Sequence, residues 1–122
     1  MKKRDSIIYK IVTGIFSLML LAGAVTYFVQ YDMVAEMFTS LGVPTEIIYP
    51  LAIAKILGII AIWFVKNPVI KNLAYLGFAI DLVSAIIAHL NAGDGGAIGP
   101  TIPLILLAIS YWYYRKLNVT VA

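Results

Sequence analysis

Four long apolar stretches, separated by short polar segments, limit what this chain can fold into more than any other feature. They cover approximately residues 7–29, 47–65, 73–90 and 98–117. The first three have the roughly 17–25 residues that a helix needs to cross a bilayer. Hydrophobic residues make up 62% of the 122-residue chain and charged residues only 12%, which is more apolar surface than a small water-soluble domain buries. We therefore predict an integral membrane protein.

The fourth stretch is less regular because it begins with Pro100 and Pro103. Proline is tolerated in a first helical turn, whose N–H groups have no partner in the helix. The helix is therefore expected to begin anywhere from Ile98 to Leu104. With this stretch included, the predicted fold is an all-α, transmembrane four-helix bundle that forms a single domain over residues 1–122.

Eight of the nine Lys and Arg residues fall on one side of such a bundle. They precede the first span, connect the second to the third, and follow the fourth: Lys2, Lys3, Arg4, Lys10, Lys66, Lys71, Arg115 and Lys116. Aromatic residues gather at both ends of the spans: Tyr27, Phe28, Tyr31 and Tyr49 at outer ends, and Trp63, Phe64, Tyr75 and Tyr111 to Tyr114 at inner ends. The positive-inside rule then predicts a multi-pass protein of the cytoplasmic (inner) membrane with both termini in the cytoplasm.

A cleaved signal peptide is an alternative reading of the first stretch. The basic residues 2–4 precede it, and Ala22-Gly23-Ala24 resembles a cleavage site. We favour a retained span because the stretch is longer than the 7–15 residues of a signal-peptide core.

The segment between the first two spans predicts a short amphipathic helix on the outer membrane surface. Its apolar residues recur at helical spacing: Met33, Met37, Phe38 and Leu41. Asp32 is the expected N-cap, and Gly42 followed by Pro44 is a typical stop. An ordinary connector whose apolar side chains touch lipid headgroups is the alternative.

Two opposite charges lie at the same depth in the second and third spans. Lys55 is ten residues from Val65 and Asp81 is eight residues from Leu73, which places both about 12–15 Å above the inner helix ends. An unpaired charge near the bilayer centre costs about 2.5–3.5 kcal/mol. We therefore predict a Lys55–Asp81 ion pair, which either fixes helix register or takes part in function.

Small and polar residues form one face of the third span: Ala74, Gly77, Asp81, Ser84 and Ala88. The second span offers Gly58 on a comparable stripe, so Gly58, Gly77 and Ala74 are expected helix-packing residues. His89, the only histidine, falls near the outer end of the third span. Together with Lys55, Asp81 and Ser84 it is a candidate ligand-binding group, although an interfacial histidine in contact with water is the alternative.

Several chemistries are excluded by composition. The chain has no cysteine, which removes disulfides, thiolate metal sites and iron–sulfur clusters. One histidine and scattered carboxylates do not form a metal-binding pattern, so no metal site is predicted. The basic residues form no patch for nucleic acid. No catalytic signature is present.

Several short blocks of residues form a recognisable pattern: Leu41-Gly42-Val43-Pro44, Leu51-Ala52-Ile53-Ala54-Lys55-Ile56-Leu57-Gly58, Lys71-Asn72-Leu73-Ala74-Tyr75-Leu76-Gly77-Phe78, Asp81-Leu82, Ala88-His89-Leu90 and Gly93-Asp94. With these blocks, nearly the whole chain resembles the bacterial DoxX-like membrane proteins, most strongly from Leu41 to Asp94. This resemblance implies a four-helix transmembrane fold. It also implies a polar constellation at Lys55, Asp81 and His89.

The resemblance implies different functions because the family is heterogeneous. One relative is a small membrane subunit of a thiosulfate:quinone oxidoreductase, which implies an accessory subunit that binds a quinone or a similar small amphiphile beside a redox partner. Animal relatives look like assembly chaperones for channels, which implies a non-catalytic interaction protein. A small solute or proton pathway, built from several protomers of a homo-oligomer, is the third hypothesis.

Overall fold

The computed structural model describes residues 2–93 and 95–121, and all its regular elements there are helical. In chain order they are α1 (Lys2–Val29), α2 (Tyr31–Ser40), the short 3-10 helix η1 (Thr45–Ile47), α3 (Ile48–Phe64), α4 (Pro68–Ala92) and α5 (Ile98–Val121). The all-α prediction is confirmed for this part of the chain. The last helix begins at Ile98, the earliest residue of its expected range.

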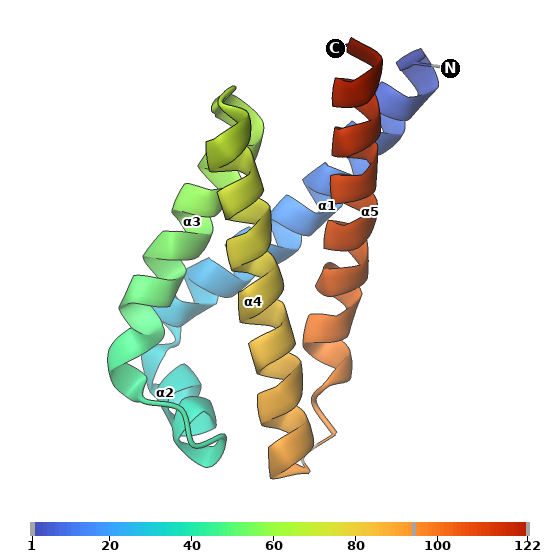
Figure 1. Ribbon diagram of the computed structural model, residues 1–122. Helices are drawn as coiled ribbons and strands as arrows, with labels where there is room; N and C mark the ends of the chain where they lie inside the picture. The colour runs from blue at the N-terminus through green and yellow to red at the C-terminus, as the bar shows by residue number, and fades with distance from the viewer. Residues whose placement is uncertain (1, 94, 122) are drawn as a thin grey trace.

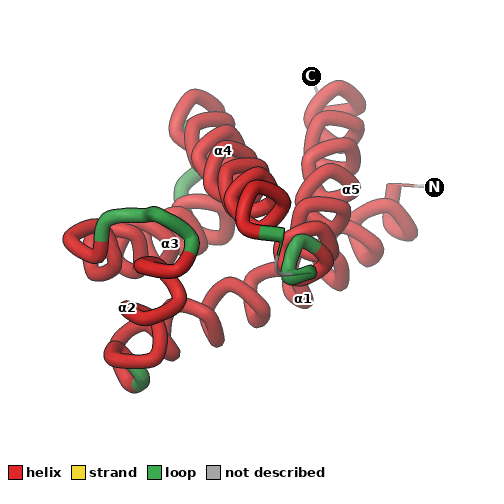
Figure 2. Tube along the Cα trace, turned by 90° about the horizontal axis from the view of Figure 1, so that it is seen from below, coloured by secondary structure: helices red, strands yellow, loops and turns green. Residues whose placement is uncertain are grey.

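The four long helices pack in a cycle, because α1 and α4 each contact both α3 and α5. Figure 1 shows α1 crossing obliquely behind the other helices. The beginning of α1, the end of α5 and the α3–α4 connection lie at one end, and α2 and the α4–α5 connection lie at the other. Figure 2 shows this opposite end, with α2 beside α3.

Three of these helices are long and apolar enough to cross a membrane: Lys3–Val29, Thr45–Phe64 and Pro68–Ala92. Their mean hydropathies are 2.0, 2.2 and 1.9, and large apolar side chains such as Leu18 and Phe64 point outward. Such a surface suits lipid and not water. The fourth long helix, α5, has 24 residues but carries polar and aromatic side chains in its second half.

The bounds of α4 follow from local chemistry at its two ends. The side chain of Asn67 accepts hydrogen bonds from the backbone N–H groups of Val69 and Ile70, and Pro68 occupies the first turn. Gly93 ends the helix in the left-handed conformation, with φ of 64°. These caps set the register of the helix that carries Asp81, Ser84 and His89.

A short helix forms between the first two long helices, as expected. The predicted N-cap is wrong, because helical backbone resumes at Tyr31, so Gln30 is the N-cap and Asp32 lies in the first turn. Val34 and Phe38 of α2 are buried together with Ile48. The helix therefore covers one end of the helical cycle, while its position on a membrane surface stays a prediction.

A buried chain of hydroxyl groups joins α1, α4 and α5. The Ser110 hydroxyl lies 2.6 Å from the Thr13 hydroxyl and 2.7 Å from the Tyr75 hydroxyl. One turn further along the same face of α1, the Trp63 indole N–H of α3 donates to the Ser17 hydroxyl over 2.8 Å. The interior polar groups are thus paired with each other, which fixes how the helices are rotated about their axes.

Candidate functional site

The ion pair predicted from the sequence is present between α3 and α4. The Lys55 Nζ atom lies 3.7 Å from Oδ2 of Asp81, and the two side chains are 12% and 22% exposed. This separation exceeds the about 2.7–2.9 Å of a charge-assisted hydrogen bond. The two charges therefore neutralise each other without a short hydrogen bond between them. N–H donors of Lys55 and carboxylate lone pairs of Asp81 stay available for other partners.

Tyr27, near the end of α1, is a third member of this cluster. The Lys55 ammonium donates to the Tyr27 hydroxyl over 3.2 Å and lies 4.3 Å from the centre of its ring. From the sequence, Tyr27 was predicted only as one of the interfacial aromatic residues. Its helical spacing from Ser17 and Ala24, both buried on the inner face of α1, was a signal for an inward position.

A cavity of about 200 Å³ separates α3 from α4 beside the ion pair. It is lined by Leu51, Ala54, Lys55, Gly58, Leu73, Ala74, Gly77, Phe78 and Asp81. Two glycines that line this cavity, Gly58 and Gly77, have different surroundings. A Cβ atom built on Gly58 would lie 2.7 Å from Cζ of Phe78, whereas one on Gly77 would meet nothing within 4 Å. Gly58 therefore allows close approach of the helices, and Gly77 leaves space.

A second cavity, of about 370 Å³, continues from Asp81 toward α2. Asp81, Ser84 and His89 of α4 line it together with Tyr27, and α2 contributes Met37 and Phe38. Leu51, Gly77 and Asp81 line both cavities, so the two adjoin at the carboxylate. We call the combined space the α3–α4 groove.

All four candidate ligand-binding residues from the sequence lie along this groove. Lys55 lines only its first cavity, while Ser84 and His89 line only the second. Most of the remaining wall is apolar. The groove therefore offers an ammonium donor, a carboxylate acceptor, a hydroxyl and an imidazole to a molecule with a small polar head and an apolar body.

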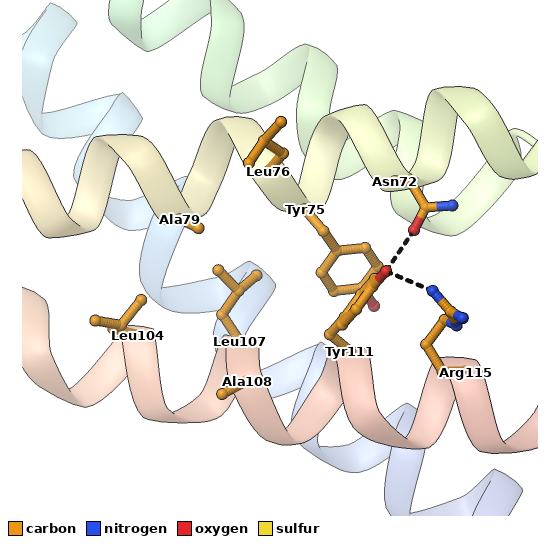
Figure 3. Close-up of a pocket in the computed structure, with 9 residues that line it drawn as sticks. All are labelled: Asn72, Tyr75, Leu76, Ala79, Leu104, Leu107, Ala108, Tyr111 and Arg115. Carbon is orange, nitrogen blue, oxygen red and sulfur yellow. Dashed lines mark hydrogen bonds between the residues drawn. The ribbon is translucent and has the colours of Figure 1, made fainter.

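A larger cavity, of about 480 Å³, lies between α4 and α5 near the end that carries the termini. Asn72, Tyr111 and Arg115 form a polar chain at one end of it (Figure 3). The Tyr111 hydroxyl donates to Oδ1 of Asn72 over 2.8 Å and accepts from Nη1 of Arg115 over 3.0 Å. In the sequence, Tyr111 and Arg115 stood out only as topology signals, and Asn72 only as part of the resembling block Lys71 to Phe78.

The comparisons with known proteins gave one match. The family model described as the DoxX-like family matches residues 11–112, which include every residue named above for the α3–α4 groove. Neither the search of curated proteins nor the search of solved structures gave a significant match.

Proposed function

The chain belongs to the DoxX-like family, and on that premise we propose that this multi-pass membrane protein binds a quinone or a similar small amphiphile in the α3–α4 groove. One observation carries the proposal. The Lys55–Asp81 pair lies where two otherwise mostly apolar cavities adjoin. A polar group buried only for packing needs no such space beside it.

The chemistry of the groove suits a head group with both oxygen acceptors and hydroxyl donors. The Lys55 ammonium has three N–H donors, of which one is used by Tyr27. The Asp81 carboxylate faces Lys55 at 3.7 Å and keeps lone pairs for a hydroxyl. A quinone carbonyl is expected to accept from Lys55, and the hydroxyl of the reduced quinol to donate to Asp81. Ser84 and His89 line the path of the remaining head or tail.

We further propose four spans, with α5 as the fourth, and both termini in the cytoplasm. Two observations support this arrangement: the beginning of α1 and the end of α5 lie at the same end of the molecule, and basic residues lie near both. It gives the ion pair a position near the middle of the bilayer. The protein would then act as an accessory subunit, holding the amphiphile for a redox partner in the cytoplasmic membrane.

The test is a binding measurement on the full chain purified in detergent. Co-purifying quinone is measured by chromatography of a solvent extract, and a short-tailed quinone is then titrated against the protein. Gly77→Leu fills the groove at a position where a Cβ meets no atom, so the fold should survive. We expect it to weaken binding by about tenfold, the effect of roughly 1.4 kcal/mol.

Gly23→Leu is the matched control, because Gly23 also has open space around a built Cβ but lies on α1 outside the groove. Binding by this variant should equal that of the parent. A parent protein that neither retains nor binds a quinone contradicts the proposal. If crosslinking then recovers a recurring membrane partner, an assembly function replaces it.

A further inference from the structure

The cavity between α4 and α5 has a composition unlike that of the α3–α4 groove. It is lined by Asn72, Tyr75, Leu76, Ala79, Leu104, Leu107, Ala108, Tyr111 and Arg115, and we call it the α4–α5 groove. Its polar groups gather at one end and its apolar groups extend toward the middle of the helices (Figure 3). We propose that it binds one anionic phospholipid, with the phosphate on Arg115 and an acyl chain along the apolar part.

The charge at the polar end is the first support. Arg115 is exposed, and within residues 2–93 and 95–121 no carboxylate pairs with it. Its guanidinium uses one donor for the Tyr111 hydroxyl, which Asn72 orients in turn. A guanidinium carries five donors in a planar fork that matches phosphate oxygens. The remaining donors are thus available for a phosphate group.

The neighbouring Lys116 provides a contrast. Its ammonium lies 3.3 Å from the buried carboxylate of Asp5. Through this ion pair Lys116 links α5 to α1. Of these two adjacent cations on α5, Arg115 is the one that lines the α4–α5 groove.

The length of the groove is the second support. On α5 the lining residues run from Leu104 to Arg115, a distance of about 16 Å at 1.5 Å per residue. The hydrocarbon core of a bilayer is about 30 Å thick, so each leaflet supplies about half of that. The whole groove, with its polar end included, is therefore about as long as half of the hydrocarbon core, and its apolar part on α5, from Leu104 to Ala108, covers about 6 Å of that length. Its volume of about 480 Å³ falls in the range of ligand pockets, roughly 300–1,000 Å³.

The groove lies at the end of the molecule that carries the two termini, and this location suits a lipid of the leaflet on that side. Basic pockets between transmembrane helices at the cytoplasmic side suit anionic headgroups. Tyr111 belongs to an aromatic run, residues 111–114, of the kind that marks the headgroup level. A neutral lipid would fill the apolar part equally well but would leave Arg115 without a net counter-charge.

Native mass spectrometry of the full chain in detergent tests the proposal. The protein is titrated with phosphatidylglycerol and with phosphatidylcholine of the same acyl chains. We expect phosphatidylglycerol to bind about fivefold more tightly, the usual worth of one basic residue near anionic lipid, because both lipids offer the same phosphate oxygens but the choline group of phosphatidylcholine cancels the net negative charge. Arg115→Gln should remove this preference, and Ala108→Trp, which fills the exposed wall, should weaken both lipids.

Lys66→Gln is the matched control, since it removes one exposed positive charge at the same end of the molecule but outside the groove. Its lipid binding should not change. Equal affinity for the two lipids, or equal effects of Arg115→Gln and Lys66→Gln, would overturn the proposal. So would disulfide dimers of Ala108→Cys in vesicles, because they would assign the groove to a second copy of the chain.

Discussion

Lys55 is held by two chemically different groups, the carboxylate of Asp81 at 3.7 Å and the hydroxyl of Tyr27 at 3.2 Å. Only the carboxylate neutralises its charge. Removing one partner of a buried pair leaves an uncompensated charge, which costs more than the pair itself contributes. Asp81 therefore lowers the free-energy cost of placing the Lys55 ammonium within the membrane.

Asp81→Asn should lower the free energy of unfolding by about 2–3 kcal/mol, somewhat less than for a fully buried pair. Adding Lys55→Met removes the unpaired ammonium and should restore part of that loss. Denaturant-induced unfolding in detergent micelles measures both variants. A double variant no more stable than Asp81→Asn alone would show that the two residues do not interact energetically.

Ser110 is the centre of the buried hydroxyl chain, since it contacts both Thr13 and Tyr75. Ser110→Ala removes the partner of the Thr13 hydroxyl and leaves the Tyr75 hydroxyl only its long bond of 3.4 Å to Tyr9, so it should cost about 1–3 kcal/mol of unfolding free energy. The control is Thr26→Val, because the Thr26 hydroxyl bonds only to the backbone of its own helix. Equal losses in the two variants would contradict a structural role for the chain.

At the scale of elements, the crossing of α3 and α4 depends on one glycine. The Phe78 ring lies against Gly58 and is also held edge-on by Phe16, with ring centres 5.2 Å apart. Because Phe78 is only 4% exposed, its ring has little freedom to move aside. The two helices are therefore close at Gly58 and separated by the groove at Gly77.

Gly58→Ala and Gly77→Ala should consequently change stability in opposite directions. The first places a methyl group against the Phe78 ring and should cost about 1–3 kcal/mol. The second meets no atom and should gain up to about 1 kcal/mol from helix propensity. Thermal unfolding in detergent compares the two variants directly. The same sign for both would mean that the separation of the helices is not as described.

For the whole molecule, α4 is the central element because both grooves use it. One face of α4 lines the α3–α4 groove through Gly77 and Asp81, and another lines the α4–α5 groove through Asn72 and Leu76. Tyr75 and Phe78 are buried between these faces. The proposed ligand in one groove and the proposed lipid in the other would therefore contact the same helix from two sides.

The proposed topology is testable with single cysteines, since the chain has none of its own. Glu36→Cys should react with a membrane-impermeant maleimide added to intact cells. Arg4→Cys, Lys66→Cys and Asn118→Cys should react only after permeabilisation, because four spans return the chain to the cytoplasm. Labelling of Asn118→Cys from outside would mean that α5 does not cross.

The membrane class, the helical fold and the Lys55–Asp81 pair were all accessible from the sequence, for two physical reasons. Span length and apolar character are properties of contiguous residues. A lone charge in lipid has a high free-energy cost, so a lysine and an aspartate at equal depth on neighbouring helices are expected to form an ion pair.

Tyr27, the two grooves and the Asn72–Tyr111–Arg115 chain required the tertiary structure. A cavity is the space left after side chains from several helices have packed, so its presence depends on crossing angles and rotations that no single segment encodes. The face of small residues on α4 illustrates this: the same pattern suits close packing or open space. The tertiary structure decides between them: the Phe78 ring fills the space at Gly58 on α3, whereas a Cβ atom on Gly77 of α4 would meet nothing within 4 Å, so this face of α4 borders open space there.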